Sequence, residues 1–310
     1  NVFDKEGCAS FDDCLMNFLA VPYEKDGKYY DRYTDDEYIS WLKFFRRLSE
    51  EGYLLDDIFI DQKNQIEEKF EQGRYFCMLY QSEDVLNQQK AACAQNSQNN
   101  YIAVDGPKNA AGDDYQLPCS GINGYTVTMI SKNCKHPKRA IAFLDYLISE
   151  HGQALTYLGV EGETYDVIEG RPVVREEVRE LLSTNRREYD KKYGADNAYW
   201  MLQNSVMQLK WKQERSDVMM QPKQWTCPYV VYSSQYDSLT LTRSRFINMS
   251  SKITELWSET LPYLLLAQTE ERFDKILQDF VKKREELGFE DLESERTKLM
   301  ESAKKKLGMR

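Results

Sequence analysis

Few side chains in this sequence have the chemistry of a catalytic centre. The chain has two histidines, His136 and His151, which flank opposite ends of a helix that is predicted from Pro137 onward. Because an α-helix rises about 1.5 Å per residue, side chains at its two ends lie too far apart to bind one metal ion. We therefore expect both histidines to stand near helix ends without a catalytic role, and we expect neither a metal nor another cofactor.

Short motifs of known chemistry are absent as well. The chain lacks the patterns GxSxG, HExxH, GxxxxGKS/T and GxGxxG, and Gly159–Gly162 lacks the strand, turn and helix that a phosphate-binding loop needs. Paired acids occur, but 51 acidic residues bring such neighbours together by chance: Asp35–Asp36, Asp56–Asp57 and Asp113–Asp114. We expect these pairs to be solvated, and we predict a protein that is not an enzyme and has no catalytic residues.

The cysteines show no metal-binding or redox spacing. No two of them form a CxxC pair, which zinc sites and thioredoxin-like centres require. An odd number leaves at least one free thiol, and we expect most of the thiols to be buried or idle. A disulfide between Cys8 and Cys14 remains open at this point. The seven cysteines are Cys8, Cys14, Cys77, Cys93, Cys119, Cys134 and Cys227.

Aromatic residues carry more information than the ionisable ones. The segment from Trp225 to Tyr236 reads WTCPYVVYSSQY and combines aromatic rings with a proline in a predicted loop. Sugar rings stack their apolar faces on Trp and Tyr, and their hydroxyl groups bond to planar polar side chains. The segment therefore either forms the wall of a binding cleft or packs its rings onto the body of the domain. Trp41 and Trp257 lie in helical stripes, where core packing is expected.

The composition excludes several classes of protein. With 41 basic and 51 acidic residues the net charge is −10, and no basic block interrupts the acidic background, which argues against nucleic-acid binding. The longest apolar cluster, Leu264–Ala267, is far shorter than the roughly 18 residues of a membrane span, so no transmembrane segment is expected. A hydrophobic fraction of 41% indicates a folded protein, and 310 residues suggest one large domain or about two smaller ones.

Hydrophobic periodicity predicts helices through much of the chain. Thr34 and Glu37 form a capping box at the start of a helix over 35–50, and a shorter helix ends at Gly73. A strong helix begins at Pro137 and is expected to close at a glycine, residue 152. Further helices are expected over 174–189, 197–212, 253–266 and 273–287, and through the last twenty residues.

Predicted strands are few. Apolar or alternating runs predict strands over 74–80, 101–104 and 124–130, and 221–237 is expected to be an aromatic loop. Strands separated by helices indicate an α/β fold with more helix than strand. The strands are too few for a complete doubly wound sheet. The sequence also begins at Asn1, without an initiator Met or a signal sequence. We therefore expect that part of the protein lies upstream.

Several segments, taken together, resemble one family. Ile66–Tyr80 reads IEEKFEQGRYFCMLY, similar to a helix, an F-x-x-G-K/R turn and a small apolar strand. Val127–Leu147 reads VTMISKNCKHPKRAIAFLDYL, similar to a strand followed by S-K-x-x-K-x-P-x-x-A and F-L-D-Y-L, while Leu158–Tyr165 contains G-I/V-E-G and Thr269–Asp274 resembles a closing helix. In this order the segments resemble extracellular solute-binding proteins (family 1) of carbohydrate ABC transporters, of the large lipoprotein, maltose-binding-protein-like type.

The resemblance implies an architecture. It is a helix-rich α/β fold of the periplasmic-binding-protein type II class, with two lobes that hinge, and here it is incomplete at the N-terminus, because the first strands and helices of the family have no counterpart. By the same resemblance, residues 1–118 are part of the second lobe and residues 119–240 are the returning part of the first lobe. Residues 241–310 are then C-terminal helices that pack mainly on the second lobe.

The resemblance also implies a ligand site. In the family an aromatic residue stacks on sugar just after the strand that follows the glycine turn, and Tyr80, Gln81, Ser82 and Glu83 occupy that place here. Another aromatic lies on the penultimate helix, where Trp257 is about one turn out of register. With the aromatic segment added, the expected ligand-binding residues are Tyr80, Gln81, Ser82, Glu83, Trp225, Tyr229, Tyr232 and Trp257.

The implied function is capture for import. The protein would be the substrate-binding component of an ABC importer, with a carbohydrate or related small solute and a membrane permease as its partners. The family is extracellular and is anchored as a lipoprotein through an upstream segment. One alternative is a cell-surface interaction or regulatory protein that keeps the fold without transport. Another is a sugar-acting enzyme, which needs two carboxylates about 5 to 10 Å apart across a cleft.

Overall fold

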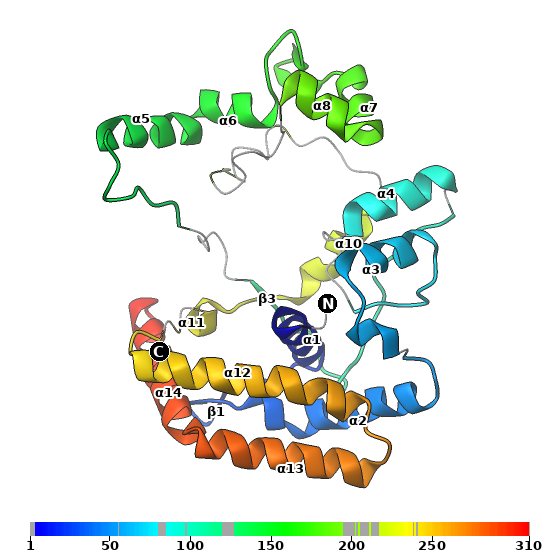
Figure 1. Ribbon diagram of the computed structural model, residues 1–310, viewed down its shortest axis with the longest axis vertical. Coiled ribbons are helices and arrows are strands. Elements are labelled where there is room, and N and C mark those ends of the chain that lie inside the picture. The colour runs from blue at the N-terminus through cyan, green and yellow to red at the C-terminus, as the bar shows by residue number, and fades with distance from the viewer. Residues whose placement is uncertain are drawn as a thin grey trace. The chain divides into compact units, whose positions relative to one another are not determined.

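A computed structural model of the chain describes residues 4–54, 56–79, 85–96, 98–119, 127–194, 202, 204, 211, 217–237, 239 and 241–309. The chain divides into two compact units (Figure 1). Unit 1 combines Asn1–Gly121 with Ser216–Arg310, and unit 2 is the segment Ile122–Arg215. The lobe boundaries expected at residues 118 and 240 stay predictions.

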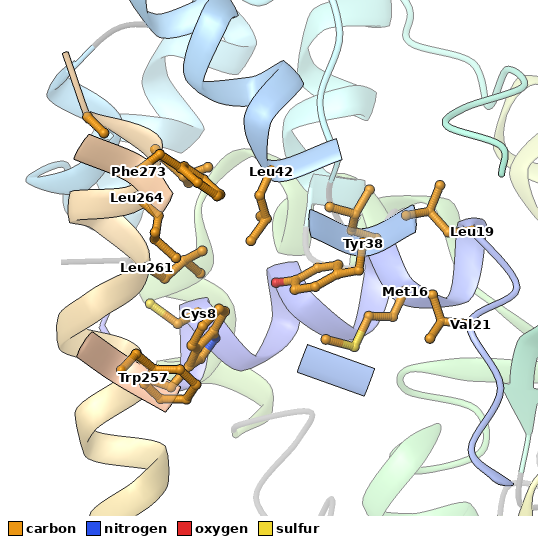
Figure 2. Packing of buried hydrophobic residues seen from close by; sticks show 14 of the residues in the cluster. Cys8, Met16, Leu19, Val21, Tyr38, Leu42, Trp257, Leu261, Leu264 and Phe273 are labelled. Carbon is orange, nitrogen blue, oxygen red and sulfur yellow. The ribbon is translucent and has the colours of Figure 1, made fainter. Parts of the chain in front are cut away.

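Four helices build the core of unit 1. They are α1 (Lys5–Phe18), α2 (Asp36–Glu50), α12 (Ser244–Leu265) and α13 (Glu270–Glu286). Helix α12 packs against the other three, and it lies beside α13 in Figure 1. Figure 2 shows how apolar side chains from these helices meet, among them Cys8, Met16, Tyr38, Leu42, Trp257, Leu261, Leu264 and Phe273.

Carboxylates at the helix starts bind backbone N–H groups that have no partner within the helix. Asp35 accepts two of these N–H groups in α2 at 3.0 and 3.3 Å, and Asp4 does the same for α1 at 3.0 and 3.1 Å. The predicted helix over 35–50 is confirmed, but its cap is Asp35 and not Thr34. The Thr34 hydroxyl donates instead to Asp31, in the turn before the helix.

One carboxylate lies inside the core. Asp12 of α1 is 1% exposed, and it accepts the indole N–H of Trp257 at 2.6 Å and the hydroxyl of Tyr38. Burial raises the pKa of the Asp12 carboxyl to about 7, although the hydrogen bonds from these two donors act in the opposite direction. Because the two donors come from α2 and α12, this carboxylate joins three helices of the core.

The C-terminal helices agree with the predictions for that end of the chain. Helices α12 and α13 include the predicted ranges except for one residue at the end of each, and the predicted helicity of the last twenty residues corresponds to α14 (Phe289–Lys306). The buried Arg284 at the end of α13 donates to Asp31 at 2.6 Å, and its guanidinium lies 3.9 Å from the ring centroid of Phe289. Lys304 of α14 pairs with Glu24, so the N-terminal part of unit 1 contacts the last helix.

Short elements complete unit 1. The strands β3 and β6 pair in parallel, with Leu117 opposite Val230 and Cys119 opposite Tyr232. This pairing joins two segments of unit 1 that are far apart in the sequence. The remaining elements are β1 (Glu24–Lys25), β2 (Lys28–Tyr29), η1 (Arg32–Thr34), η2 (Asp56–Phe59), α3 (Lys63–Glu71), α4 (Leu86–Gln95), β3 (Leu117–Cys119), α10 (Asp217–Thr226), η5 (Cys227–Tyr229), β6 (Val230–Tyr232) and α11 (Ser234–Asp237).

Three predicted strands and one predicted loop differ from the structure. The described residues of 74–80, 101–104 and 124–130 lie outside strands, and 221–237, predicted as a loop, is mostly α10, η5, β6 and α11. A strand needs a neighbouring strand as well as an apolar or alternating run, and periodicity does not reveal that neighbour. Most of the predicted helix over 197–212 lies outside the described residues.

Unit 2 begins with a pair of helices. Pro137 occupies the first turn of α5 (Pro137–Ile148), where its missing N–H costs no hydrogen bond. The predicted end at Gly152 is wrong, because Ser149 interrupts the helix and caps α6 (Glu150–Tyr157), accepting the Gly152 N–H at 3.2 Å. The other elements of unit 2 are β4 (Tyr165–Ile168), β5 (Arg171–Val174), α7 (Glu176–Thr184) and α8 (Arg186–Tyr193).

A tight turn leads into the β4–β5 hairpin. The buried hydroxyl of Thr164 donates to the Leu158 carbonyl at 2.7 Å and accepts the Val160 N–H at 2.8 Å. Gly159 has a φ of +91°, and a Cβ there would lie 2.3 Å from the Thr164 Oγ1. The G-V-E-G segment therefore forms a hydrogen-bonded turn, and its first glycine is required by both φ and space.

All seven cysteines lie in the described residues and none of them forms a disulfide, so the link between Cys8 and Cys14 that the sequence left open is absent. Among the helices that the structure describes, none combines the length and the apolar character needed to cross a bilayer.

Leu261 tests the packing of the core. It is 0% exposed and lies in the middle of the cluster, so Leu261→Ala is expected to lower the free energy of unfolding by roughly 2 to 5 kcal/mol, measured by urea denaturation. The control is Tyr263→Ala on the same helix, because Tyr263 is 69% exposed and its loss is expected to cost less than about 1 kcal/mol. Equal losses in the two variants would contradict this packing.

Candidate functional site

Four aromatic rings from distant parts of the chain meet in unit 1. They are Phe18 at the end of α1, Tyr115 before β3, Trp225 at the end of α10, and Tyr229 in η5; we call them the aromatic cluster. The centroid of the Trp225 ring lies 5.9, 5.5 and 5.3 Å from those of Phe18, Tyr115 and Tyr229. Tyr115 in turn lies 4.9 Å from both Phe18 and Tyr229, so each ring contacts at least two others.

Strand pairing explains why Tyr115 and Tyr229 meet although more than a hundred residues separate them. Tyr229 directly precedes β6 and Tyr115 stands two residues before β3. Because β3 and β6 run in parallel with Leu117 opposite Val230, the residues before the two strands lie on the same end of the pair. The parallel register therefore assembles half of the aromatic cluster.

Tyr115 is the buried centre of the cluster. Its hydroxyl accepts the Gly106 N–H at 3.1 Å and donates to the Gly106 carbonyl at 3.3 Å. Burial raises the pKa of the Tyr115 hydroxyl, and the charge of Asp105 adds to this. A Cβ on residue 106 would lie 2.5 Å from a ring carbon of Phe18, so the absence of a side chain at Gly106 leaves room for that ring.

Charged groups surround the rings. The Trp225 indole N–H donates to the Asp105 carboxylate at 3.1 Å, which orients the indole. The Lys108 ammonium lies 5.0 Å from the centroid of the Tyr115 ring and 3.9 Å from the Asp114 carboxylate. Flat apolar rings beside an exposed carboxylate and an ammonium are the groups that recognise the faces and hydroxyls of a sugar.

The structure brings together two of the predicted site residues. Trp225 and Tyr229 belong to the aromatic cluster, and both keep part of their surface exposed. Tyr232 lies further along β6 and is 76% exposed. Trp257 of α12 is 3% exposed, and its ring centroid lies 4.8 Å from that of Phe280. It is therefore a core residue, as its helical stripe predicts. The positions of Tyr80, Gln81, Ser82 and Glu83 lie outside the described residues.

Four contributors to the site, Phe18, Asp105, Lys108 and Tyr115, are not among the residues predicted from the sequence. Phe18 lies in a helix that is not predicted from the sequence, and the other three lie between the predicted strands over 101–104 and 124–130. The feature of the sequence that points to Tyr115 is its position two residues before Leu117-Pro118-Cys119, a short run that forms β3. The contact of Tyr115 with Tyr229 depends on that pairing, which the sequence alone does not reveal.

The structure also locates the candidates for metal binding and catalysis. Within the ranges that the structure describes, no group of three or more His, Cys, Asp or Glu is placed to hold a metal ion. His136 occupies the N-cap position of α5 without a capping hydrogen bond from its side chain, and the Nδ1 of His151 lies 2.9 Å from the Tyr146 hydroxyl. Of the acidic pairs, Asp35 caps α2, and Asp113 accepts the Asn109 amide at 2.9 Å on the surface.

A shallow hollow of about 250 Å³ lies elsewhere, between α12 and α13. It shares no residue with the aromatic cluster and contains none of the predicted site residues. Its lining mixes both signs of charge with apolar groups and consists of Leu256, Glu259, Thr260, Tyr263, Arg272, Ile276, Asp279, Phe280 and Lys283.

Comparison of the sequence with known proteins finds two similar proteins of Bacillus subtilis (strain 168). Lipoprotein LipO is 26% identical over 164 residues, which is 51% of this chain and 33% of LipO. The polygalacturonan/rhamnogalacturonan-binding protein YtcQ is 25% identical over 158 residues, which is 50% of this chain and 31% of YtcQ. The matches therefore span about a third of the length of these relatives. No family model matches the chain.

Comparison of the structure finds a similar fold in a solved structure. The crystal structure of alginate-binding protein AlgQ2 without calcium ion matches 94% of this chain and 62% of its own chain, with a TM-score of 0.65 and 15% identity. This likeness confirms the predicted helix-rich α/β binding-protein fold. Together with the two sequence relatives it also confirms the resemblance that was drawn from the sequence segments. The chain is therefore similar in sequence to LipO and YtcQ and shares the fold of the alginate-binding protein.

Proposed function

We propose that this protein is the substrate-binding component of an ABC importer and that it captures an oligosaccharide. The observation that carries the proposal is the aromatic cluster, in which Trp225 and Tyr229 keep part of their rings exposed beside Asp105 and Lys108. An oligosaccharide stacks its rings on such aromatic faces, and its hydroxyls bond to the charged groups at their edges. The Trp225 indole is held in place for this by its hydrogen bond to Asp105.

The names of the relatives support the same ligand class. YtcQ is named for binding polygalacturonan and rhamnogalacturonan, and AlgQ2 for binding alginate. Polygalacturonan and alginate are acidic polysaccharides, so acidic and neutral oligosaccharides are both natural probes. The site around Trp225 offers the Asp105 carboxylate and the Lys108 ammonium beside the rings. The choice between acidic and neutral sugars follows from which of these two groups faces the ligand.

The finer parts of the proposal rest on the family resemblance. In it, residues 1–118 are part of the second lobe, residues 119–240 are the returning part of the first lobe, and residues 241–310 are helices that pack mainly on the second. The ligand then lies in a cleft that closes between the lobes. Tyr80, Gln81, Ser82, Glu83 and Tyr232 complete the proposed site, whereas a contact of Trp257 with ligand requires the core to open. The proposed location is extracellular, with a lipoprotein anchor like the one that the name of LipO records. The proposed permease recognises the liganded form, and no bond is made or broken.

A thermal-shift screen of the chain tests this function. The probes are tetragalacturonate, an alginate tetrasaccharide and maltotetraose, with a tetrapeptide and spermidine as ligands of other classes. A ligand at 100 times its Kd stabilises the folded state by about 2.7 kcal/mol, so one oligosaccharide is expected to raise the Tm by several degrees while the peptide and the polyamine do not. If no oligosaccharide changes the Tm, the importer proposal fails and the cell-surface interaction protein becomes the better explanation.

A further inference from the structure

Two glutamine side chains bind the backbone of the segment Tyr101–Asp105 in unit 1. Over Tyr101–Asp105 the described residues show no strand pairing, yet two of its residues have both backbone groups bonded. The carboxamide of Gln89 donates to the Tyr101 carbonyl at 2.7 Å and accepts the Tyr101 N–H at 3.1 Å. The carboxamide of Gln221 does the same for Ala103, at 2.8 and 2.7 Å.

The chemistry of these contacts explains why both side chains are glutamine. In an extended chain the N–H and C=O of one residue point to the same side, and every second residue repeats that direction. A carboxamide carries one acceptor and one donor group, so it binds both backbone groups of a single residue as an adjacent strand would. Gln89 from α4 and Gln221 from α10 thus substitute for a missing strand along Tyr101 and Ala103.

The spacing continues the pattern to Trp225. Gln221 and Trp225 lie four residues apart on α10, about 6 Å along the helix, and Ala103 and Asp105 lie two residues apart on the extended segment, about 6.7 Å. These lengths nearly agree, so the Gln221 contact with Ala103 aligns the indole N–H of Trp225 with Asp105, at 3.1 Å. The two contacts form a ladder between α10 and the segment.

Helix α10 is weakened beside the ladder. Pro222 lies inside the helix directly after Gln221 and has no N–H for the backbone hydrogen bond at that position. The hydrogen bonds from the Gln221 side chain to Ala103 therefore fix α10 at a position where its own backbone hydrogen bonding is incomplete. The half-buried Gln221 uses both groups of its carboxamide on Ala103, and it acts through the residue four positions later.

We propose that Gln221 is a positioning residue, which fixes α10 on the Tyr101–Asp105 segment and so sets the orientation of the Trp225 ring for sugar stacking. The expected change in ligand affinity rests on the proposed function, whereas the expected change in the orientation of Trp225 does not. Gln89 supports the same segment one step further from the indole. The consequence is that a change at Gln221 alters ligand affinity without removing any group that contacts the ligand.

The test variant is Gln221→Glu, which keeps the length of the side chain and removes the N–H donor to the Ala103 carbonyl. The control is Gln224→Glu, which makes the same change of charge at an exposed position of the same helix. The chain has five tryptophans, so ¹⁵N-indole NMR resolves the Trp225 N–H, assigned through Trp225→Phe, and the Trp257 N–H, which reports on the core.

At pH 7.5 the Gln221→Glu variant is expected to shift the Trp225 indole signal, leave the Trp257 signal unchanged and weaken binding of tetragalacturonate or maltotetraose about tenfold. At pH 4.5 the protonated side chain regains an O–H donor, and part of the wild-type signal is expected to return. A variant Gln221→Met, which has neither donor nor acceptor, is expected to show the same shift without recovery at pH 4.5. Should Gln221→Glu lose the Trp257 signal and fail to fold, Gln221→Met provides the same comparison at pH 7.5.

Two results separate the claims. If the Trp225 signal and the affinity in Gln221→Glu match those in Gln224→Glu, the positioning role is wrong even though sugar binding stands. If the wild type binds neither oligosaccharide, the proposed function fails, while the indole signals still decide whether Gln221 orients Trp225.

Discussion

Replacement of Trp225 by alanine is expected to weaken oligosaccharide binding about thirtyfold. The indole supplies the largest partly exposed ring of the aromatic cluster, and truncation of such an anchor typically costs about 2 kcal/mol of binding free energy. The change is measured by isothermal titration calorimetry with whichever oligosaccharide raises the Tm of the wild type. Trp225 also packs on Phe18, so the Tm of the unliganded variant is recorded to separate binding from folding.

Trp225→Phe is the matched control for this result. It keeps an aromatic face next to Tyr115 and Tyr229 and removes the N–H donated to Asp105. Its affinity is expected to lie between those of the wild type and the alanine variant. Binding that is unchanged in Trp225→Ala would show that the ligand does not stack on this ring, and it would move the site away from the aromatic cluster.

The second large effect is a pH dependence of stability that depends on Asp12. Its pKa is raised from an ordinary value of 3.8 to about 7 by burial, so the folded state binds this proton more tightly than the unfolded state. Stability from this group is therefore fully present below pH 4 and is lost as the pH rises through 7. Between pH 5 and pH 8 the wild type is expected to lose about 2 to 3 kcal/mol relative to Asp12→Asn.

The Asp12→Asn variant keeps the geometry of the site. The carbonyl of the introduced carboxamide can accept the indole N–H of Trp257 while its amide group donates to the Tyr38 hydroxyl, and no charge is buried at any pH. Urea denaturation at pH 5, 6, 7 and 8 measures the difference between the two proteins. The control is Asp13→Asn, because Asp13 is an exposed carboxylate next in the chain. A constant difference between wild type and Asp12→Asn across this pH range would contradict the burial of a proton-binding carboxyl in the core.

The helices are predictable where caps and apolar stripes are strong. The predicted helix over 35–50 begins directly after its cap, Asp35, and Pro137 starts α5 as expected. Helix α1 is not predicted, although Asp4 caps it and Cys8 and Leu15 are buried on it, because its stripe is short and interrupted by the polar Asp12 and Asp13. Asp12 is nevertheless buried, because its hydrogen-bond partners Tyr38 and Trp257 come from helices far away in the sequence.

The candidate site is predictable only in part. The aromatic segment points to Trp225 and Tyr229, because their types alone suit sugar stacking. Asp105, Tyr115 and Phe18 join them through the β3–β6 pairing and the contacts of α10, which depend on long-range geometry.

Trp257 shows how two sequence arguments can disagree. Its helical stripe predicts a core residue, whereas the family resemblance implies a ligand contact. Its hydrogen bond to Asp12 at 2.6 Å and its contact with Phe280 account for the core position. The stripe is therefore the better guide at this residue, because it follows from the local period of the helix and needs no alignment to a relative.

The measurement that tests the central claim most directly is an NMR titration of the ¹⁵N-labelled indoles with tetragalacturonate, the alginate tetrasaccharide and maltotetraose. One of these is expected to shift the Trp225 N–H signal along a saturable curve, while the Trp257 signal, held by Asp12 in the core, stays in place. Saturable binding that leaves Trp225 unmoved, or no binding by any of the three, would contradict oligosaccharide capture at the aromatic cluster.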